Sequence, residues 1–102
     1  MNAVEVVPRL ETAGCPWIID VRSKAEYRSG HIPGAVHIPF WGVLLRQSSL
    51  PDNRNAEIVL TCEHGLRAQI AAAQLGLLGF TRVVLLERHM SGWRRKNLPI
   101  HT

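Results

Sequence analysis

The residues of this chain best suited to chemistry lie in one short segment, CEHGLR, from Cys62 to Arg67. The segment follows an apolar run typical of a buried strand and precedes an apolar run typical of a helix. In such a loop the backbone N–H groups and the helix N-terminus converge and form a site for an anion. Helix N-termini and nearby cations also lower the pKa of a cysteine thiol. The segment therefore predicts that Cys62 is a thiolate nucleophile acting on an anionic substrate.

The other residues of the loop have separate expected roles. Gly65 lets the backbone turn tightly with a positive φ angle, and Arg67 supplies a permanent positive charge where a bound anion would sit. His64 can add a second charge. Glu63 opposes both, because a carboxylate pointing toward the sulfur raises the pKa of a thiol. We expect the substrate to contact the loop at Glu63, His64, Gly65 and Leu66.

The alternative interpretation of Cys62 is a buried, inert cysteine at a strand end. A strand end, a glycine-containing loop and an arginine at the helix start coincide here, and together they favour the nucleophile. The chain has one further cysteine, Cys15, which we expect to be a spectator thiol. Two cysteines are too few for a disulfide framework, so we predict free thiols and a cytoplasmic location.

The elements that position this loop follow from apolar spacing and turn signals. Strands are predicted at residues 17–21, 35–38, 57–61 and 82–86. Helices are predicted at residues 4–13, 24–29, 40–47, 66–78 and 91–96, with a polar loop at 48–55. Ser23 and Glu26 have the spacing of a capping box, and Gly30 ends that helix. Helix 66–78 is apolar on most sides, so we expect it to be well covered, with Gly76 closely packed.

Strands that alternate with helices predict an α/β fold with a parallel sheet covered on both faces. In open sheets of this kind, ligands bind beyond the carboxyl ends of the strands. Residues able to do chemistry gather at that edge, where they end or follow the predicted strands: Asp20, Arg22, Cys62, Glu87 and Arg88.

Composition narrows the class of protein. The chain has 102 residues, of which 46% are hydrophobic and 20% charged, as expected for one soluble globular domain. Twelve Lys and Arg against eight Asp and Glu give a net charge of +4, which attracts small anions or serves solubility alone. The cluster Arg94 to Lys96 is a solvated helix face or docks an acidic carrier partner, and it is too sparse for nucleic acid. Neither a membrane-spanning segment nor a secretory signal is expected.

Two motifs together resemble the single-domain rhodaneses. The first is IDVRSKAEYRSGHIPGAVHIP, and the second is Cys62-x-x-Gly65-x-Arg67 downstream; a late Trp93 before an N-L-P ending adds to them. The resemblance extends over residues 17–99. It implies that residues 1–102 form one rhodanese-like, three-layer α/β/α domain with a mostly parallel sheet of four to five strands.

The resemblance also implies a thiosulfate:cyanide-type sulfurtransferase. Cys62 attacks the outer sulfur of thiosulfate or of a persulfide donor, and the resulting persulfide passes sulfur to cyanide, a thiol or a protein. No cofactor and no metal is implied, and neither is a nucleic acid or membrane partner. The six positions from Cys62 to Arg67 resemble the sulfur-handling loops, because related phosphatase and arsenate-reductase loops are one residue longer.

Two alternatives stay open. The first is a low-turnover sulfur carrier or docking module, and the second is a phosphatase-like or arsenate-reductase-like enzyme. Three departures from the family pattern motivate the first. Glu63 places an acid in the loop, Ala68 replaces a frequent serine, and Arg88-His89 stands where a Gly-Gly pair is common. We expect the two large side chains to narrow the pocket or add positive charge, and Arg88 to contact the substrate.

The remaining residues of the first motif are predicted to be structural. Asp20 and Arg22 can pair with each other at the strand end, while Glu26, Gly30 and His31 shape the adjoining helix and turn. We expect His31 and His37 to satisfy local hydrogen bonds, since no Cys or His pairs have zinc-like spacing. Trp41, after Pro39, is the candidate for an aromatic residue at the rim of a pocket.

Overall fold

The computed structural model describes residues 1–10 and 12–102. At its centre lies a four-stranded sheet in which all pairings are parallel, with the order β2-β1-β3-β4. The strands are β1 (Trp17–Asp20), β2 (Val36–His37), β3 (Ile58–Thr61) and β4 (Val83–Leu85). Each lies inside its predicted range, because short apolar runs bounded by turn residues form strands buried between two layers. The predicted parallel α/β sheet is confirmed.

The helices are α1 (Ala3–Val6), α2 (Lys24–Ser29), α3 (Leu66–Leu77) and α4 (His89–Arg95). Single 3₁₀ turns occupy Val7–Arg9, Phe40–Gly42 and Gln47–Ser49. The predicted capping box of α2 is confirmed: the Ser23 hydroxyl accepts from the Glu26 N–H, and the Glu26 carboxylate accepts from the Ser23 N–H. Gly30 ends the helix with a positive φ of 155°. None of the described helices is long and apolar enough to cross a membrane.

Three of the predicted helices differ from the structure. Residues 4–13 form α1 and then a 3₁₀ turn, because Pro8 has no N–H to continue the α-helical ladder; Glu11, in the same range, lies outside the described residues. Residues 40–47 form no α-helix but a 3₁₀ turn that stops at Gly42. The last helix begins at His89 rather than at residue 91.

Less of the surface of α3 is buried than predicted. Its buried residues are Ala68, Ala71 and Leu75, a single stripe at helical spacing. Leu66 and Leu77 are 71% and 85% exposed, so the expectation that most sides are covered is wrong. Gly76 is also exposed, with no atom within 4 Å of the position of an added Cβ, and the predicted close packing there is wrong.

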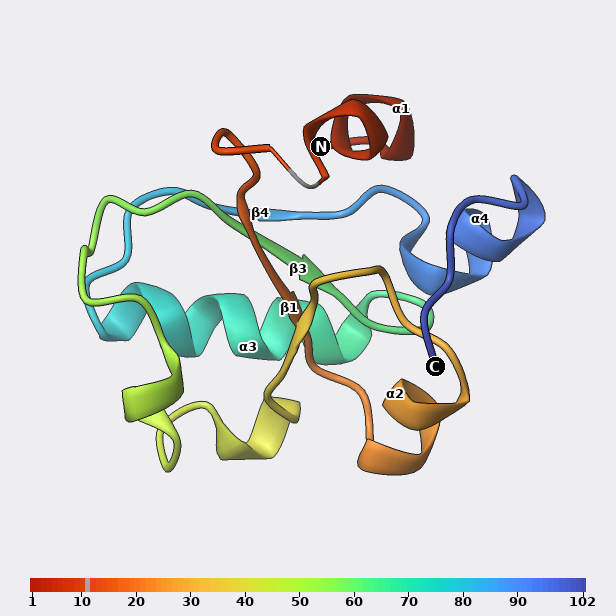
Figure 1. The fold of residues 1–102 in the computed structure, drawn as a ribbon. Coiled ribbons are helices and arrows are strands. Elements are labelled where there is room, and N and C mark those ends of the chain that lie inside the picture. Colours follow the sequence, from red (N-terminus) through yellow and green to blue (C-terminus); the bar gives the residue numbers. More distant parts are fainter. Residues whose placement is uncertain (11) are drawn as a thin grey trace.

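Two separate cores fill the space on the two faces of the sheet. Ile19, Ile58 and Leu60 pack with α3 on one face. Ile18 and Val59, their neighbours in the strands, point to the opposite face and pack with α1 and α4. This alternation follows from the two-residue period of a strand. Figure 1 shows α3 on one side of the sheet and α1 on the other, which confirms the three-layer arrangement.

Candidate active site

Cys62 is the first residue after β3, at the carboxyl edge of the sheet. The residue is 1% exposed, and its Sγ accepts a hydrogen bond of 2.8 Å from the backbone N–H of Gly65. Gly65 has φ 116° and is the N-cap of α3, a helix of 12 residues. The loop therefore curls so that the sulfur faces the N-terminus of a helix, where backbone N–H groups stabilise negative charge. This is the arrangement expected from the spacing of Cys62 and Gly65.

His89 holds the same loop from the other side. The backbone N–H of Cys62 donates to His89 Nδ1 over 3.2 Å, and the Met90 N–H donates to the Cys62 carbonyl over 2.9 Å. Burial lowers the pKa of His89, and the neighbouring His64 lowers it further. A neutral imidazole is thus favoured, as Nδ1 needs in order to accept a hydrogen bond.

Sequence reasoning missed this contact of His89. It identified the residue only as a large side chain in place of a glycine beside the loop. The available signal was its position just after the last strand, at the same edge as Cys62. Nothing in the residue order shows that its ring turns toward the Cys62 backbone.

The backbone at Arg88 and His89 has the conformation that favours glycine. The φ angles are 64° for Arg88 and 49° for His89, both in the left-handed region. A non-glycine residue there costs on the order of 1–2 kcal/mol. The chain therefore keeps, at some cost in stability, two large side chains at the place where the resemblance implies a Gly-Gly pair.

Arg67 forms a two-pronged ion pair with Glu26 of α2. The two guanidinium nitrogens donate to the two carboxylate oxygens over 2.6 and 2.9 Å. This bond, aided by the α2 cap at Ser23, lowers the pKa of Glu26 to about 2. The pKa of Arg67 is raised, first by Glu26 and to a smaller extent by Cys62. A carboxylate thus partners the Arg67 guanidinium, and the expected role of Arg67 toward a bound anion stays a prediction.

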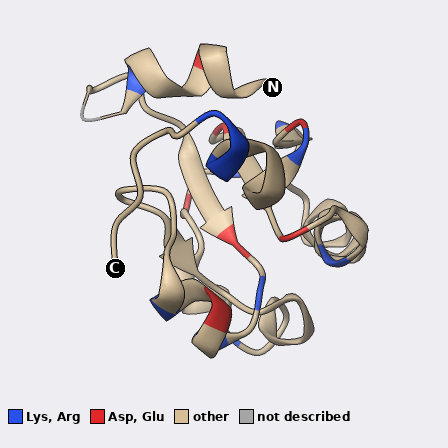
Figure 2. Cartoon of the chain, turned by 90° about the vertical axis from the view of Figure 1, so that its right-hand side faces the viewer, with Lys and Arg blue, Asp and Glu red and all other residues tan. Residues whose placement is uncertain are grey.

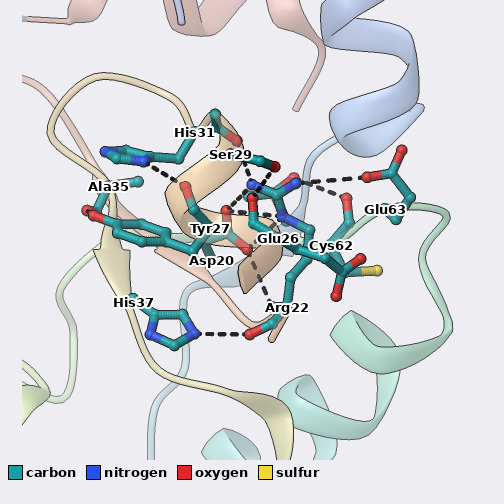
Figure 3. A network of polar contacts seen from close by, with 12 residues as sticks. Asp20, Arg22, Glu26, Tyr27, Ser29, His31, Ala35, His37, Cys62 and Glu63 are labelled. Atoms are coloured by element: carbon teal, nitrogen blue, oxygen red, sulfur yellow. Dashed lines mark hydrogen bonds and ion pairs between the residues drawn. The ribbon is translucent and has the colours of Figure 1, made fainter. Parts of the chain in front are cut away.

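Asp20 and Arg22 form a buried pair at the end of β1, as predicted (Figure 3). Arg22 Nε donates to Asp20 Oδ1 over 2.9 Å, and another guanidinium nitrogen donates to the Gly30 carbonyl over 2.7 Å. Both side chains are 1% exposed or less, and a buried charge needs such partners. The pair therefore fixes the turn that follows α2 against the carboxyl edge of the sheet.

The Glu63 carboxylate lies between two arginines. One oxygen is 3.5 Å from Arg22, and the other pairs with Arg94 of α4. Figure 3 shows the Glu63 carboxylate turned toward the Arg22 guanidinium. In Figure 2, red acidic and blue basic segments are both seen along the ribbon on the face turned toward the viewer. The charge of Glu63 is thus compensated locally, a pairing that sequence reasoning did not foresee because Arg94 lies 31 residues away.

The remaining predicted contact residues lie around the loop. His64 and Arg88 are exposed and line one hollow of about 570 Å³ beside α4. Leu66 is exposed on the first turn of α3. Trp41 lines a separate hollow of about 270 Å³ with Ser23 and His37 rather than the one beside His64.

Two further expectations concern residues outside the chemistry. His31 Nδ1 bonds to the Tyr27 carbonyl and His37 Nε2 to the Arg22 carbonyl, both at 2.8 Å, so the predicted local hydrogen bonds are confirmed. Cys15 precedes β1, whereas Cys62 follows β3, and these parallel strands pair residue by residue from Trp17↔Ile58 to Asp20↔Thr61. The two free thiols therefore lie at opposite ends of the sheet.

Comparison with curated proteins gives relatives that handle sulfur. A sulfurtransferase of Allochromatium vinosum is 35% identical over 83 residues, covering 81% of this chain and 76% of that protein. A thiosulfate sulfurtransferase of Pseudomonas fluorescens is 33% identical over 79 residues, covering 76% and 69% respectively. A candidate sulfur carrier protein of Bacillus subtilis is 40% identical over 79 residues, or 78% of this chain. The chain spans only 42% of that last protein.

Solved structures share the fold. The solution structure of a rhodanese-like domain from Anabaena sp. has a TM-score of 0.83 and 28% identity, covering 99% of this chain and 76% of that one. A rhodanese-related protein from Thermoplasma volcanium has a TM-score of 0.83 at 24% identity, covering 99% and 95%. The family model of the rhodanese-like domain matches residues 3–96. Because that match extends over nearly all of the chain and the folds agree, this chain belongs to the rhodanese-like domain family.

Proposed function

We propose that this chain is a sulfurtransferase that carries sulfur as a persulfide on Cys62. The observation that carries the proposal is the hydrogen bond from the Gly65 N–H to Cys62 Sγ at the start of α3. Oriented N–H groups in a site shielded from water stabilise negative charge on sulfur more strongly than water-exposed groups do. The sulfurtransferase names of two relatives support the same chemistry.

The first step loads the cysteine. The Cys62 thiolate attacks the outer sulfur of thiosulfate and forms a new S–S bond to it. The S–S bond of the donor breaks, and its electron pair leaves with sulfite. A persulfide donor reacts in the same way and leaves as a thiolate.

The second step removes the sulfur from Cys62. A nucleophilic acceptor, such as cyanide, a thiolate or a protein thiolate, attacks the outer sulfur of the persulfide. The bond between the two sulfurs breaks, and its electron pair returns to Cys62 as a thiolate. Over the two steps one neutral sulfur atom passes from the donor to the acceptor, and Cys62 returns to its starting thiolate form.

The site residues have distinct proposed roles. Arg67 stabilises the anionic donor and positions the start of α3 through Glu26. His64 and Arg88 contact the donor from the hollow beside the loop. Asp20 and Arg22 hold the turn behind the loop. Residues 1–102 act as one domain, and both thiols stay reduced in the cytoplasm.

A carrier with slow turnover is the second candidate. One observation favours it: Cys62 is only 1% exposed, so a donor reaches the sulfur only after the loop or its neighbours move. Steady-state kinetics with thiosulfate and cyanide separates the two. A kcat within the usual range for enzymes, about 1–10³ s⁻¹, would exclude the carrier.

Intact mass spectrometry tests the proposal. The protein is incubated with thiosulfate or with a low-molecular-weight persulfide, and the gain of one sulfur atom is measured. Cys62→Ser is the test variant, and Cys15→Ser is its matched control at the opposite end of the sheet. We expect the gain in wild type and in Cys15→Ser, and none in Cys62→Ser. Loading that persists in Cys62→Ser, or no loading of wild type by either donor, would refute the proposal.

A further inference from the structure

Two hollows border α4 on the side of the molecule that carries the Cys62 loop. The larger has a volume of about 570 Å³ and is lined by His64, Arg88, Ser91, Gly92, Arg95 and Lys96. The smaller, of about 150 Å³, reaches Asn2, Ala3 and Val4 and shares Arg88, Gly92 and Lys96 with the larger. Three lining residues are common to both, so the hollows are adjacent; the two together, from His64 to Val4, are called the basic groove below.

The basic groove carries positive charge that the chain does not compensate. Within residues 1–10 and 12–102, Arg88, Arg95 and Lys96 form no ion pair. Arg94 differs, because it is paired with Glu63. One acidic residue, Glu87, lines the smaller hollow. Arg94 is therefore tied to the Cys62 loop through Glu63, whereas Arg95 and Lys96 line the groove. Figure 2 shows this basic stretch of α4 in blue.

We propose that the basic groove docks an acidic, extended segment of the protein that exchanges sulfur with Cys62, an inference that rests on the proposed sulfur transfer. Sites for small molecules enclose the ligand among mostly apolar side chains. Here Arg88, Arg95 and Lys96 are exposed, and the groove continues to Val4, which is 69% exposed. The small donor of the proposed function needs only the end of the groove at His64 and Arg88; along the rest of the open groove, charge complementarity favours a chain of carboxylates.

The groove is connected to the reacting cysteine by short covalent and hydrogen-bonded links. His64 is two residues from Cys62, and Arg88 precedes His89, whose Nδ1 accepts from the Cys62 N–H. The Met90 N–H, at the start of α4, donates to the Cys62 carbonyl. A segment held along α4 therefore passes beside the Cys62 loop, and a thiol attached to it can reach the persulfide once the loop or its neighbours move.

Peptide binding tests the docking separately from the sulfur chemistry. The protein is Cys62→Ser, and the probe is a long polyglutamate peptide with a fluorescent label, followed by anisotropy at low salt. We expect saturable binding that weakens as salt rises. Arg95→Gln/Lys96→Gln should weaken it roughly threefold to tenfold, the loss expected for two exposed charge pairs. The matched control, Arg28→Gln/Arg82→Gln, removes the same net charge elsewhere and should change the affinity less than about twofold.

Several results would overturn the docking proposal. Equal weakening by the two double variants would mean that only net charge acts. Equal affinity for triglutamate would identify a small-ligand site, and tighter binding of a single-stranded oligonucleotide would identify a nucleic-acid surface. Absence of binding at low salt would refute the proposal directly.

A transfer assay separates this inference from the proposed function. Wild type loaded with persulfide is offered a cysteine peptide flanked by glutamates or its glutamine counterpart. Docking predicts faster transfer to the acidic peptide by roughly the same threefold to tenfold. Equal transfer to both peptides refutes docking and leaves the function intact. Binding without any persulfide formation refutes the function and leaves the groove as a docking surface.

Discussion

The Gly65 N–H donates a hydrogen bond to Cys62 Sγ over 2.8 Å, and this contact depends on residue 65 having no side chain. Gly65 has φ 116°, a value that L-residues rarely adopt. A Cβ built there would lie 2.9 Å from His89 Nε2. The imidazole thus occupies the space that a larger residue would need, and the shape of the loop is set jointly by the glycine and by His89.

Gly65→Ala should therefore destabilise the protein and disturb the site. We expect a loss of at least about 2 kcal/mol, from backbone strain and from the contact with His89. Persulfide yield should fall as well, because the N–H at residue 65 no longer points at Sγ. Urea unfolding and intact mass after thiosulfate treatment measure the two effects. Wild-type values in both would show that the loop does not need glycine.

A double variant separates strain from the clash with His89. His89→Gly removes the ring and relieves φ 49° at the same residue. If the clash contributes, Gly65→Ala should cost less in the His89→Gly background than in wild type, by about 0.5 kcal/mol or more. Equal costs in the two backgrounds would assign the whole effect to the φ angle of residue 65.

The ion pair of Arg67 with Glu26 should give stability that depends on acid pH. Because the folded state lowers the pKa of Glu26 from 4.5 to about 2, the folded state binds fewer protons between these values. The stabilisation is therefore fully present above about pH 4.5 and is lost as pH falls through about pH 2. The Glu26 side chain is 34% exposed, and screening by solvent therefore reduces this stabilisation to about 1 kcal/mol.

Glu26→Gln tests this pH dependence. The variant should be less stable than wild type at neutral pH by about 1 kcal/mol. The difference should shrink on acidification toward about pH 2, because the wild-type carboxylate is then protonated as well. Urea unfolding over that range gives the comparison. A gap between variant and wild type that is constant with pH would contradict the ion-pair explanation.

Glu63→Gln should improve the use of thiosulfate. The substitution removes a negative charge beside the loop and frees Arg94 from its ion pair, while Arg22 keeps Asp20. We expect kcat/KM for thiosulfate to rise about threefold or more, the effect of one exposed charge contact. The rise should be smaller with a persulfide donor, which carries one negative charge against the two of thiosulfate and serves as the internal control. An unchanged or lower kcat/KM for thiosulfate would show that Glu63 serves the loop geometry instead.

Arg88→Gly should stabilise the protein slightly. Arg88 has φ 64°, and glycine adopts this conformation without the steric cost of a Cβ. Glycine also gives the unfolded chain more conformational entropy, which opposes this effect. We therefore expect the free energy of unfolding to rise by only about 0.5 kcal/mol. Arg95→Gly, at the last residue of α4, should instead destabilise by about 0.5 kcal/mol. Destabilisation by Arg88→Gly would mean that the Arg88 side chain has stabilising contacts.

The strands, the α2 cap and the position of Cys62 could be predicted from local sequence. Apolar runs such as residues 57–61 predict strands reliably, because a strand buried on both faces of the sheet needs apolar side chains at nearly every position. The spacing of Ser23 and Glu26 determines a cap within one turn. The extent of coverage on α3 could not be predicted, because it depends on which neighbours pack there. The predicted helix at residues 40–47 was wrong because the apolar pattern there is weak and Gly42 disfavours a continuous helix; the chain forms only a 3₁₀ turn at Phe40–Gly42.

The sequence by itself determined which residue types meet at the carboxyl edge: a cysteine, a glycine and an arginine at fixed spacing in one loop. Hydrogen bonding within the loop is local and follows from the chain order. Only the tertiary structure decided the partners of the charged groups, since Arg67 meets Glu26 over 41 residues and Glu63 meets Arg94 over 31. The same holds for His89, which reaches the Cys62 backbone across 27 residues. Contacts at such separations depend on how the sheet and the helices pack, which residue spacing does not encode.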